Sequence, residues 1–373
     1  MRVVMVSKAL VVGAYQRKLE ELAKLPEMEL TAIVPAGWRD PRGALTLDRA
    51  HTTGYELLVA PLAFNGQYHL HFYPTLGRLL RRLRPDVLHV DEEPYNLATW
   101  HALRLGQAIG ARSLFFTWQN LNRRYPWPFR HFETANYRRA ACAIAGNQDA
   151  VSVLRAKGYR GPVAVIPQFG VDPDIFTPAP SSRPLAEDRA FSIGYAGGLV
   201  PEKGVDLLLA ACATLPDARW ALHILGDGPD RARLSALVAE LGIADRVQFL
   251  GRRPSTALPA FYRGWDVLVL PSRSRPNWVE QFGRVLIEAM ACGVPVIGSH
   301  TGEIPNVIGR AGVTFPEDDI GALRAALAEL ATDPARRAAL AEQGRARVLA
   351  HFTQAQIATA TYRVYRQMLG TPM

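Results

Sequence analysis

The feature that most constrains the fold is a regular alternation along the chain of short apolar runs with longer amphipathic stretches. Parallel strands joined by crossover helices produce this alternation, because buried strands are apolar throughout and each helix has one apolar face. In the first half, helical spacing occurs in stretches that include 16–24 and 75–84. The strands predicted there are 3–6, 30–34, 87–90, 113–117, 142–145 and 163–166. The pattern indicates an α/β fold.

The same alternation returns in the second half of the chain. Its predicted strands are 191–195, 221–225, 247–250, 267–270, 294–298 and 313–315. Between the halves, residues 169–184 are rich in Pro, Asp and Ser and have no periodicity, which is typical of a linker. Since 373 residues also exceed what one core usually organises, we predict two domains, 1–175 and 176–354.

Two doubly wound domains that face each other place the carboxyl ends of both sheets along one cleft, where such sheets bind ligands. The sequence therefore predicts a nucleotide-binding cleft. Neither the GxGxxG fingerprint of dinucleotide-binding enzymes nor the GxxxxGK[ST] loop of ATPases occurs in the chain. Their absence argues against a dinucleotide oxidoreductase and an ordinary ATPase, so other groups must hold the phosphates.

The positive charge is concentrated in the first half of the chain. Residues 1–180 contain 22 Lys and Arg against 15 Asp and Glu, whereas the remainder contains 21 against 19. A basic half suggests an anionic partner, such as nucleic acid or the inner membrane surface, although basic residues can also simply solvate helices. The segment 123–132 interleaves arginines with aromatic residues, which suits a membrane interface, a nucleic acid or a packed loop.

Three cysteines, Cys142, Cys212 and Cys292, lie in apolar runs without the spacing that a metal site needs. We interpret them as buried packing thiols. The first residues lack the polar stretch and small-residue cleavage site of a secretory leader, and no run of about 18 apolar residues occurs. We expect a cytoplasmic protein without a membrane span.

The stretch 271–305 carries the most chemical information. A helix is predicted at 282–291, and Gly283 at its start would direct free N–H groups and the positive end of the helix dipole towards a diphosphate. Glu280 precedes the helix and Glu288 lies within it, so one carboxylate can face a sugar while the other accepts hydrogen bonds from a ribose diol. In the alternative interpretation, Glu280 caps the helix and Glu288 forms a surface ion pair.

The sequence of this stretch resembles the retaining glycosyltransferases of family 4, which have the GT-B fold. Glu280 and Glu288 form the spacing E-x7-E, followed by Ala-Met-Ala-Cys-Gly-Val-Pro-Val. Further similar segments are 197–204, 224–229, 249–251, 302–305, the linker 170–176 and the ending 362–365. The resemblance implies two Rossmann-like doubly wound domains facing across a deep cleft, with a helix near 355–373 packed back on the first domain.

The resemblance also implies roles at the donor site. Glu288 resembles the glutamate that binds the ribose, Glu280 the carboxylate that contacts the donor sugar, and Lys203 the lysine that neutralises the leaving phosphate. The other implied positions are the backbone amides of Phe282, Gly283 and Arg284 at the diphosphate or sugar, the main chain at Arg252 beside the base, and Gly13, which admits the diphosphate from the first domain.

One departure from the family concerns a phosphate-binding arginine. The family usually has Gly-Arg beside the first strand of the nucleotide domain, whereas Gly198 follows Gly197 here. Arginine suits phosphate because its planar group can contact two oxygens. Arg275 is the preferred replacement, because Pro276 restricts its backbone to extended conformations. The other nearby arginines are Arg253, Arg273 and Arg284.

A second departure concerns the histidine that the family commonly places after the fourth strand of the first domain. Here Gln119 occupies that place, within Thr117-Trp-Gln-Asn120. Glutamine can hydrogen-bond a sugar but cannot act as a base. The front-face mechanism proposed for the family does not require one, because the leaving phosphate accepts the acceptor's proton. We expect acceptor choice to reside in the first-domain loops 91–96 and 118–122.

These observations predict a retaining hexosyltransferase that uses a nucleotide diphosphate sugar, with UDP preferred over GDP. The implied acceptor is a saccharide or a lipid-linked glycan of polysaccharide or glycolipid assembly, and the basic first domain suggests contact with the inner face of the membrane. No metal or other cofactor is expected, since 172–174 resembles an Asp-x-Asp metal motif only superficially. The alternatives are a UDP-sugar epimerase of GT-B architecture and a scaffold that binds sugar nucleotide without catalysis.

Overall fold

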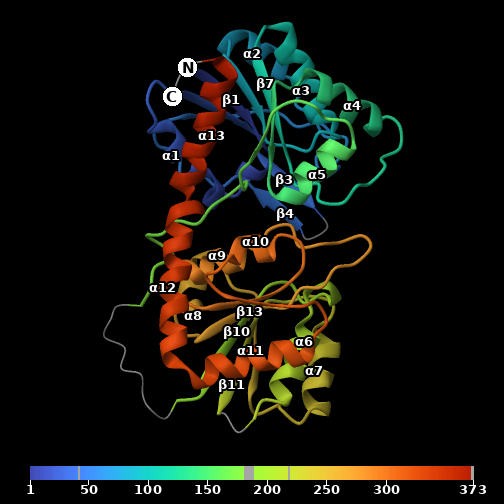
Figure 1. The fold of residues 1–373 in the computed structure, drawn as a ribbon. Coiled ribbons are helices and arrows are strands. Elements are labelled where there is room, and N and C mark those ends of the chain that lie inside the picture. Colours follow the sequence, from blue (N-terminus) through green and yellow to red (C-terminus); the bar gives the residue numbers. More distant parts are fainter. Residues whose placement is uncertain (41–42, 180–188, 217–218, 371–373) are drawn as a thin grey trace. The chain divides into compact units, whose positions relative to one another are not determined.

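The computed structural model describes residues 1–40, 43–179, 189–216 and 219–370. The chain forms two compact units (Figure 1). The first unit consists of Met1–Gly170 together with Gln354–Met373, and the second consists of Val171–Thr353. The chain therefore passes from one unit to the other twice, first within the predicted linker and again just before the last helix.

The first unit is built around a seven-stranded parallel sheet with the order β5-β2-β1-β6-β7-β8-β9. In chain order its strands are β1 (Arg2–Val6), β2 (Glu29–Val34), β5 (Glu56–Val59), β6 (Val87–Val90), β7 (Arg112–Thr117), β8 (Cys142–Ala145) and β9 (Val163–Val165). In β1, Val3 and Met5 belong to one apolar cluster, while Val4 and Val6 belong to the cluster on the opposite face. Burial on both faces explains why the strand is apolar throughout.

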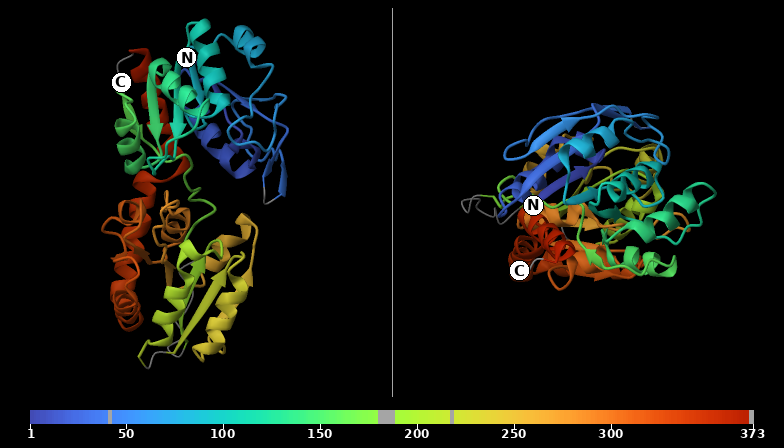
Figure 2. Two further views of the ribbon diagram at one scale, coloured as in Figure 1. Left: turned by 90° about the vertical axis from the view of Figure 1, so that its right-hand side faces the viewer. Right: turned by 90° about the horizontal axis from the view of Figure 1, so that it is seen from above.

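Helices cover both faces of this sheet (Figure 2). The cluster with Val3 and Met5 lies under α1 (Arg17–Ala23) and α13 (Gln354–Leu369). The opposite cluster lies under α2 (Leu76–Leu83), α3 (Leu97–Ala108) and α5 (Gln148–Ala156), and α4 (Phe129–Arg139) packs beside α3. The sheet is therefore doubly wound, and the ends of its strands are left for a binding site.

The last helix, α13, is an integral part of the first unit. It packs along α1 (Figure 1), and the Tyr365 hydroxyl lies 2.7 Å from Nδ1 of His89 in β6. Burial lowers the pKa of His89 to about 4, so this histidine is neutral near pH 7. At the crossing point the Gln354 amide bonds both backbone groups of Gly170.

The second unit repeats the plan with a six-stranded parallel sheet of order β12-β11-β10-β13-β14-β15. Its strands are β10 (Phe191–Ala196), β11 (Trp220–Leu225), β12 (Val247–Gly251), β13 (Val267–Leu270), β14 (Val296–Ser299) and β15 (Val313–Phe315). Its helices are α6 (Val205–Ala213), α7 (Arg231–Glu240), α8 (Leu258–Tyr262), α9 (Arg284–Ala291), α10 (Ile304–Ile308), α11 (Ile320–Thr332) and α12 (Pro334–His351). The predicted α/β class with two doubly wound sheets is confirmed.

Three strands of the first unit were not predicted. β5 is an edge strand of the main sheet, and β3 (Gly37–Asp40) pairs antiparallel with β4 (Gly43–Thr46) as a separate hairpin. All of β4 is exposed and β5 is only partly covered, so neither has the continuous apolar run of a central strand. The three cysteines are buried, as predicted. Across the described residues, no helix combines the length and apolarity needed to cross a bilayer.

Candidate functional site

The core of the candidate donor site in the second unit is an ion pair between Lys203 and Glu280. Lys203 ends a short 3-10 helix after β10, and Glu280 lies between β13 and α9. Nζ of Lys203 is 2.5 Å from Oε2 of Glu280, which also accepts a hydrogen bond of 3.0 Å from the Ser272 hydroxyl. The structure thus brings together two residues that lie 77 positions apart and that the sequence assigned to one site.

The backbone of Glu280 is fixed by the segment that begins at Gly302. A Cβ atom at Gly302 would lie 2.0 Å from the carbonyl oxygen of Glu280, so only glycine allows this close approach. The next residue, Glu303, donates its backbone N–H to the same carbonyl at 3.2 Å. The Gly-Glu-Ile-Pro segment therefore holds the carboxylate of Glu280 in position beside Lys203.

Helix α9 begins at Arg284, two residues after the predicted start. Its N-cap is Gly283, with φ of +78° and no side-chain hydrogen bond at the cap. Glu280 therefore does not cap the helix, and this alternative interpretation is wrong. The aromatic ring of Phe282 is buried, 5.8 Å from the ring of Phe352, so Phe282 can offer only its backbone to a ligand.

Glu288 is buried inside α9, with 4% of its surface exposed. Oε2 accepts a hydrogen bond of 2.7 Å from the Tyr262 hydroxyl, and Oε1 accepts one of 2.8 Å from Nε of Arg284. Burial, together with the adjacent carboxylate, raises the pKa of Tyr262, so its hydroxyl stays protonated and donates. The ion pair of the alternative interpretation forms, with Arg284, but Glu288 itself is buried rather than at the helix surface. Each carboxylate oxygen has a second lone pair for a further donor.

The arginines near Gly198 differ in whether they form ion pairs. Arg273 is buried and contacts Asp206 at 3.2 Å and Asp318 at 3.0 Å, while Arg284 pairs with Glu288. Arg275 is exposed. Its charge contributes to the lowered pKa of Glu317, but among the described residues it forms no ion pair.

The remaining predicted positions of the second unit lie at its surface. Arg252 and Arg253 are exposed directly after β12. Gly198 is also exposed, and a Cβ atom at this position would meet nothing within 4 Å. The site therefore has room for a longer side chain where the family usually has arginine.

Trp278 lies beside Lys203 in the candidate donor site, although the sequence did not single it out as a site residue. Its main chain forms a tight turn with Arg275, with hydrogen bonds in both directions. The turn places Nζ of Lys203 4.9 Å from the centroid of the Trp278 ring, which is a cation–π contact. Ser272 was missed as well. The signal that could have identified Trp278 is the presence of a tryptophan two residues before Glu280.

In the first unit, polar side chains gather at the carboxyl ends of β6 and β7. Gln119 follows β7 with 7% of its surface exposed, and neither atom of its amide has a hydrogen bond of normal geometry among the described residues, although the Tyr125 hydroxyl lies close by. The Glu93 carboxylate accepts hydrogen bonds from the Thr117 hydroxyl at 2.6 Å and from the Trp118 N–H at 2.7 Å. Burial raises the pKa of Glu93 to about 7.

A second ion pair lies at the same edge, between Lys8 after β1 and Glu92 after β6. Burial opposes ionisation of Glu92, but Lys8 and His71 beside it lower its pKa to about 2. Nζ of Lys8 also lies 5.5 Å from the centroid of the Trp38 ring. The sequence did not identify this pair, because its residues lie 84 positions apart and neither lies in a segment that carries the family resemblance.

Gly13 lies in the first unit at the start of a short 3-10 helix after β1. A Cβ atom there would lie 2.3 Å from Oδ2 of Asp48. Packing inside the unit is therefore sufficient to explain the glycine.

Two families of known proteins match this chain, one in each half. The family described as "Glycosyl transferases group 1" matches residues 181–347, and the family described as "Glycosyl transferase 4-like domain" matches residues 12–168. A GDP-mannose-dependent α-(1-6)-phosphatidylinositol monomannoside mannosyltransferase of Mycolicibacterium smegmatis is 36% identical over 201 residues, which cover 50% of this chain and 52% of the relative. A D-inositol 3-phosphate glycosyltransferase of Stackebrandtia nassauensis is 38% identical over 189 residues, covering 46% and 42%. The chain thus spans about half the length of the curated relatives it matches.

Two solved structures show the same fold over nearly the whole chain. Sucrose-phosphate synthase of Thermosynechococcus elongatus has a TM-score of 0.73 at 22% identity, with 99% of both chains covered. The Anabaena protein HepE, crystallised with UDP, has a TM-score of 0.75 at 19% identity, with 98% of this chain and all of the other covered.

Proposed function

Because the chain belongs to the group 1 glycosyltransferases of family 4, which have the GT-B fold, we propose that it transfers a hexosyl group from a nucleotide diphosphate sugar to a saccharide or lipid-linked acceptor, with retention of configuration. The observation that carries this proposal is the Lys203–Glu280 pair, supported by Ser272 and by the close approach of Gly302. A cation for the diphosphate and a carboxylate for the sugar hydroxyls thus lie side by side.

In the proposed donor complex, Lys203 turns from Glu280 to the leaving phosphate. The carboxylate of Glu280 is then free to accept hydrogen bonds from the sugar, while Glu288 accepts one from the ribose diol. The N–H groups at the start of α9 provide further donors to the diphosphate. Lys203 exchanges Glu280 for the phosphate, Glu280 exchanges Lys203 for sugar hydroxyls, and Glu288 gains a further donor, so both carboxylates stay hydrogen-bonded throughout binding.

Retention of configuration is consistent with Gln119, because a glutamine cannot act as a base. In the proposed front-face reaction, the bond between C1 of the sugar and the phosphate oxygen breaks, and the acceptor oxygen attaches to C1 from the same side. The released phosphate oxygen takes the acceptor's proton. Negative charge develops on the diphosphate, and Lys203 and an arginine stabilise it there. We propose that this charge compensation needs no metal ion.

We retain the prediction that the base of the donor is uracil, although one relative is named for GDP-mannose. A thermal-shift screen with UDP, GDP, UDP-hexoses and GDP-hexoses tests this choice. Stabilisation by UDP and a UDP-hexose, with none by the guanine compounds, is the expected result. Stabilisation by GDP-mannose alone would reverse the assignment of the base but keep the enzyme class, whereas no stabilisation by any of them would contradict the proposed function.

A further inference from the structure

Between residues 73 and 140 of the first unit, the exposed charges are strongly biased towards the positive sign. The structure describes every residue in this range, and none of its aspartates and glutamates is exposed: Asp86, Asp91, Glu92, Glu93 and Glu133 are all buried or half-buried. Ten arginines are exposed there: Arg78, Arg81, Arg82, Arg84, Arg104, Arg112, Arg123, Arg124, Arg130 and Arg138. We call these ten residues the arginine face.

The arginine face is broad because three neighbouring helices carry much of it. Helix α2 packs beside α3, and α3 packs beside α4. A helix of 12 residues, as in α3, is about 18 Å long, and each helix with its side chains is about 10 Å wide. The positive charge therefore covers a surface rather than a narrow groove, and it suits an extended anionic partner.

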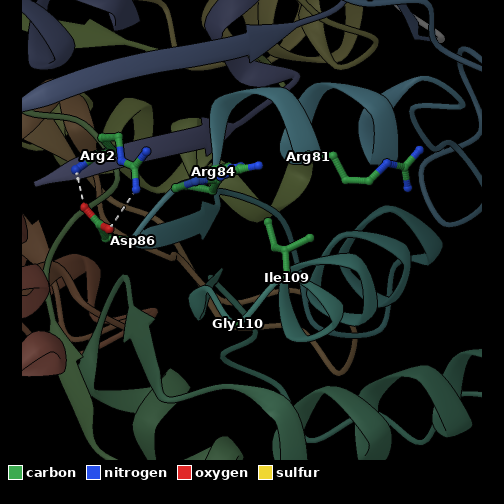
Figure 3. Close-up of a pocket in the computed structure, with 7 residues that line it drawn as sticks. Arg2, Arg81, Arg84, Asp86, Ile109 and Gly110 are labelled. Carbon is green, nitrogen blue, oxygen red and sulfur yellow. Dashed lines mark hydrogen bonds and ion pairs between the residues drawn. The ribbon is translucent and has the colours of Figure 1, made fainter.

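One end of the arginine face contains a hollow of about 550 Å³ (Figure 3). Arg81 and Arg84 line it from α2 and its end, opposite Ile109 and Gly110. The backbone N–H of Arg2 donates to Asp86 at 2.7 Å, and this carboxylate also pairs with the Arg2 guanidinium at 3.5 Å. Among the described residues, no carboxylate pairs with Arg81 or Arg84, so both guanidinium groups are available to a phosphate.

Exposed apolar side chains border the arginine face at the loop before α4. Trp127 in this loop is 83% exposed, and Phe64 and Leu70 in a neighbouring loop are 61% and 39% exposed. The two loops are in contact, because the ring centroid of His69 lies 6.0 Å from that of Tyr125. A small anion such as free phosphate gives no reason to expose these side chains, whereas the boundary region of a bilayer accepts them beside its anionic headgroups.

We propose that the arginine face is a docking surface for a bilayer that contains anionic lipids. Lipid phosphates contact the arginines, including those of the hollow, and Trp127 enters the boundary between headgroups and acyl chains. A single-stranded nucleic acid would use the arginines and Trp127 for stacking, but it would leave Phe64 and Leu70 without a role. Docking does not require donor or acceptor, so it is testable separately from glycosyl transfer.

The test is co-sedimentation of the full chain with vesicles of phosphatidylcholine alone or mixed with phosphatidylglycerol, without any nucleotide sugar. We expect binding to the mixed vesicles only, weakening as salt is added. Neutralising one arginine near an anionic surface lowers the affinity about fivefold, so the triple variant Arg81→Gln, Arg82→Gln, Arg84→Gln should bind on the order of a hundredfold more weakly. Trp127→Ser should weaken binding while preserving its salt dependence.

The matched control removes three exposed arginines elsewhere: Arg310→Gln, Arg324→Gln, Arg363→Gln. This control lowers the net charge by the same amount as the triple variant of Arg81, Arg82 and Arg84. It should bind vesicles nearly as well as the wild type. Nucleotide binding should be the same in all variants, which shows that each is folded. Equal losses in both triple variants, no binding of the wild type to mixed vesicles, or binding of single-stranded DNA in place of vesicles would each overturn the proposal.

Discussion

Glu288 already accepts hydrogen bonds from Tyr262 and Arg284 in the free protein, so its proposed contact with ribose adds a third donor to a buried carboxylate. We expect Glu288→Ala to weaken binding of the nucleoside diphosphate by about 1.5 to 3 kcal/mol, because the diol loses a charged acceptor. Isothermal titration calorimetry measures this loss. Tyr262→Phe is the control, since it removes an internal donor but keeps the ribose acceptor. Equal weakening by both variants would assign the effect to packing.

Glu280 is expected to behave differently, because its proposed partner is the sugar. Glu280→Ala releases Lys203 from its ion pair, so affinity for the nucleoside diphosphate should stay the same or rise. Transfer should fall, since the variant no longer orients the donor sugar. Calorimetry with the diphosphate beside a turnover assay separates the two effects. A parallel loss of affinity and turnover would remove Glu280 from the sugar contact.

Arg275 is the arginine best placed to replace the one absent at Gly198, because it is exposed while Arg273 and Arg284 are paired. We expect Arg275→Ala to lower turnover on the order of tenfold and to affect nucleotide binding less, since the phosphate gains charge as the glycosidic bond breaks. Gly198→Arg added to Arg275→Ala should restore turnover, because the position has space. Wild-type turnover in the single variant would move the assignment to Arg253.

At the level of residues, spacing identified what lies within one continuous segment, whereas Lys203 was assigned to the site only through the family resemblance. Glu280, Gly283 and Glu288 share a loop and a helix, so their spacing revealed them. The partners that lie far away in sequence were not identifiable, including the pair of Lys8 with Glu92 and the donor from Tyr262 to Glu288. Such contacts depend on which strands are neighbours in a sheet, and no local pattern encodes that order.

At the level of elements, the packing of α13 on the sheet involves His89, whose imidazole is neutral in the folded state. Burial lowers the pKa of His89 from 6.5 to about 4. The folded state therefore binds fewer protons than the unfolded state below pH 6.5, so this contribution to stability is complete above pH 6.5 and is lost as the pH falls towards 4.

The corresponding test is chemical denaturation at pH 7 and pH 4.5, comparing the wild type with His89→Gln. Glutamine can still bond the Tyr365 hydroxyl but does not titrate. The wild type should lose roughly 2 to 3 kcal/mol more than the variant between the two pH values. An identical loss in both proteins would show that His89 does not contribute to the pH dependence.

Elements were predicted correctly where burial imposes a continuous apolar run, as in β1 and β13, whose residues are almost all buried. It failed for the hairpin of β3 and β4 and for the edge strand β5, because partly exposed strands need no such run. The start of α9 was misplaced by two residues, since an N-cap glycine resembles the helix interior when only apolar spacing is considered.

For the whole molecule, we expect transfer to persist in excess EDTA, because Lys203, an arginine and the start of α9 compensate the charge of the diphosphate. Turnover measured with EDTA, and again after addition of magnesium or manganese, tests this expectation. Unchanged turnover agrees with it. Loss of transfer in EDTA that either ion restores would show that a divalent cation is part of the reaction.

The most direct test of the account is to incubate the chain with UDP- and GDP-hexoses, with and without a membrane lipid extract as acceptor, and to follow the sugar by NMR. We expect release of the nucleoside diphosphate together with a new glycosidic bond of the donor's anomeric configuration, only when acceptor is present. Conversion of the nucleotide sugar into its epimer without acceptor, or binding without any reaction, would contradict it.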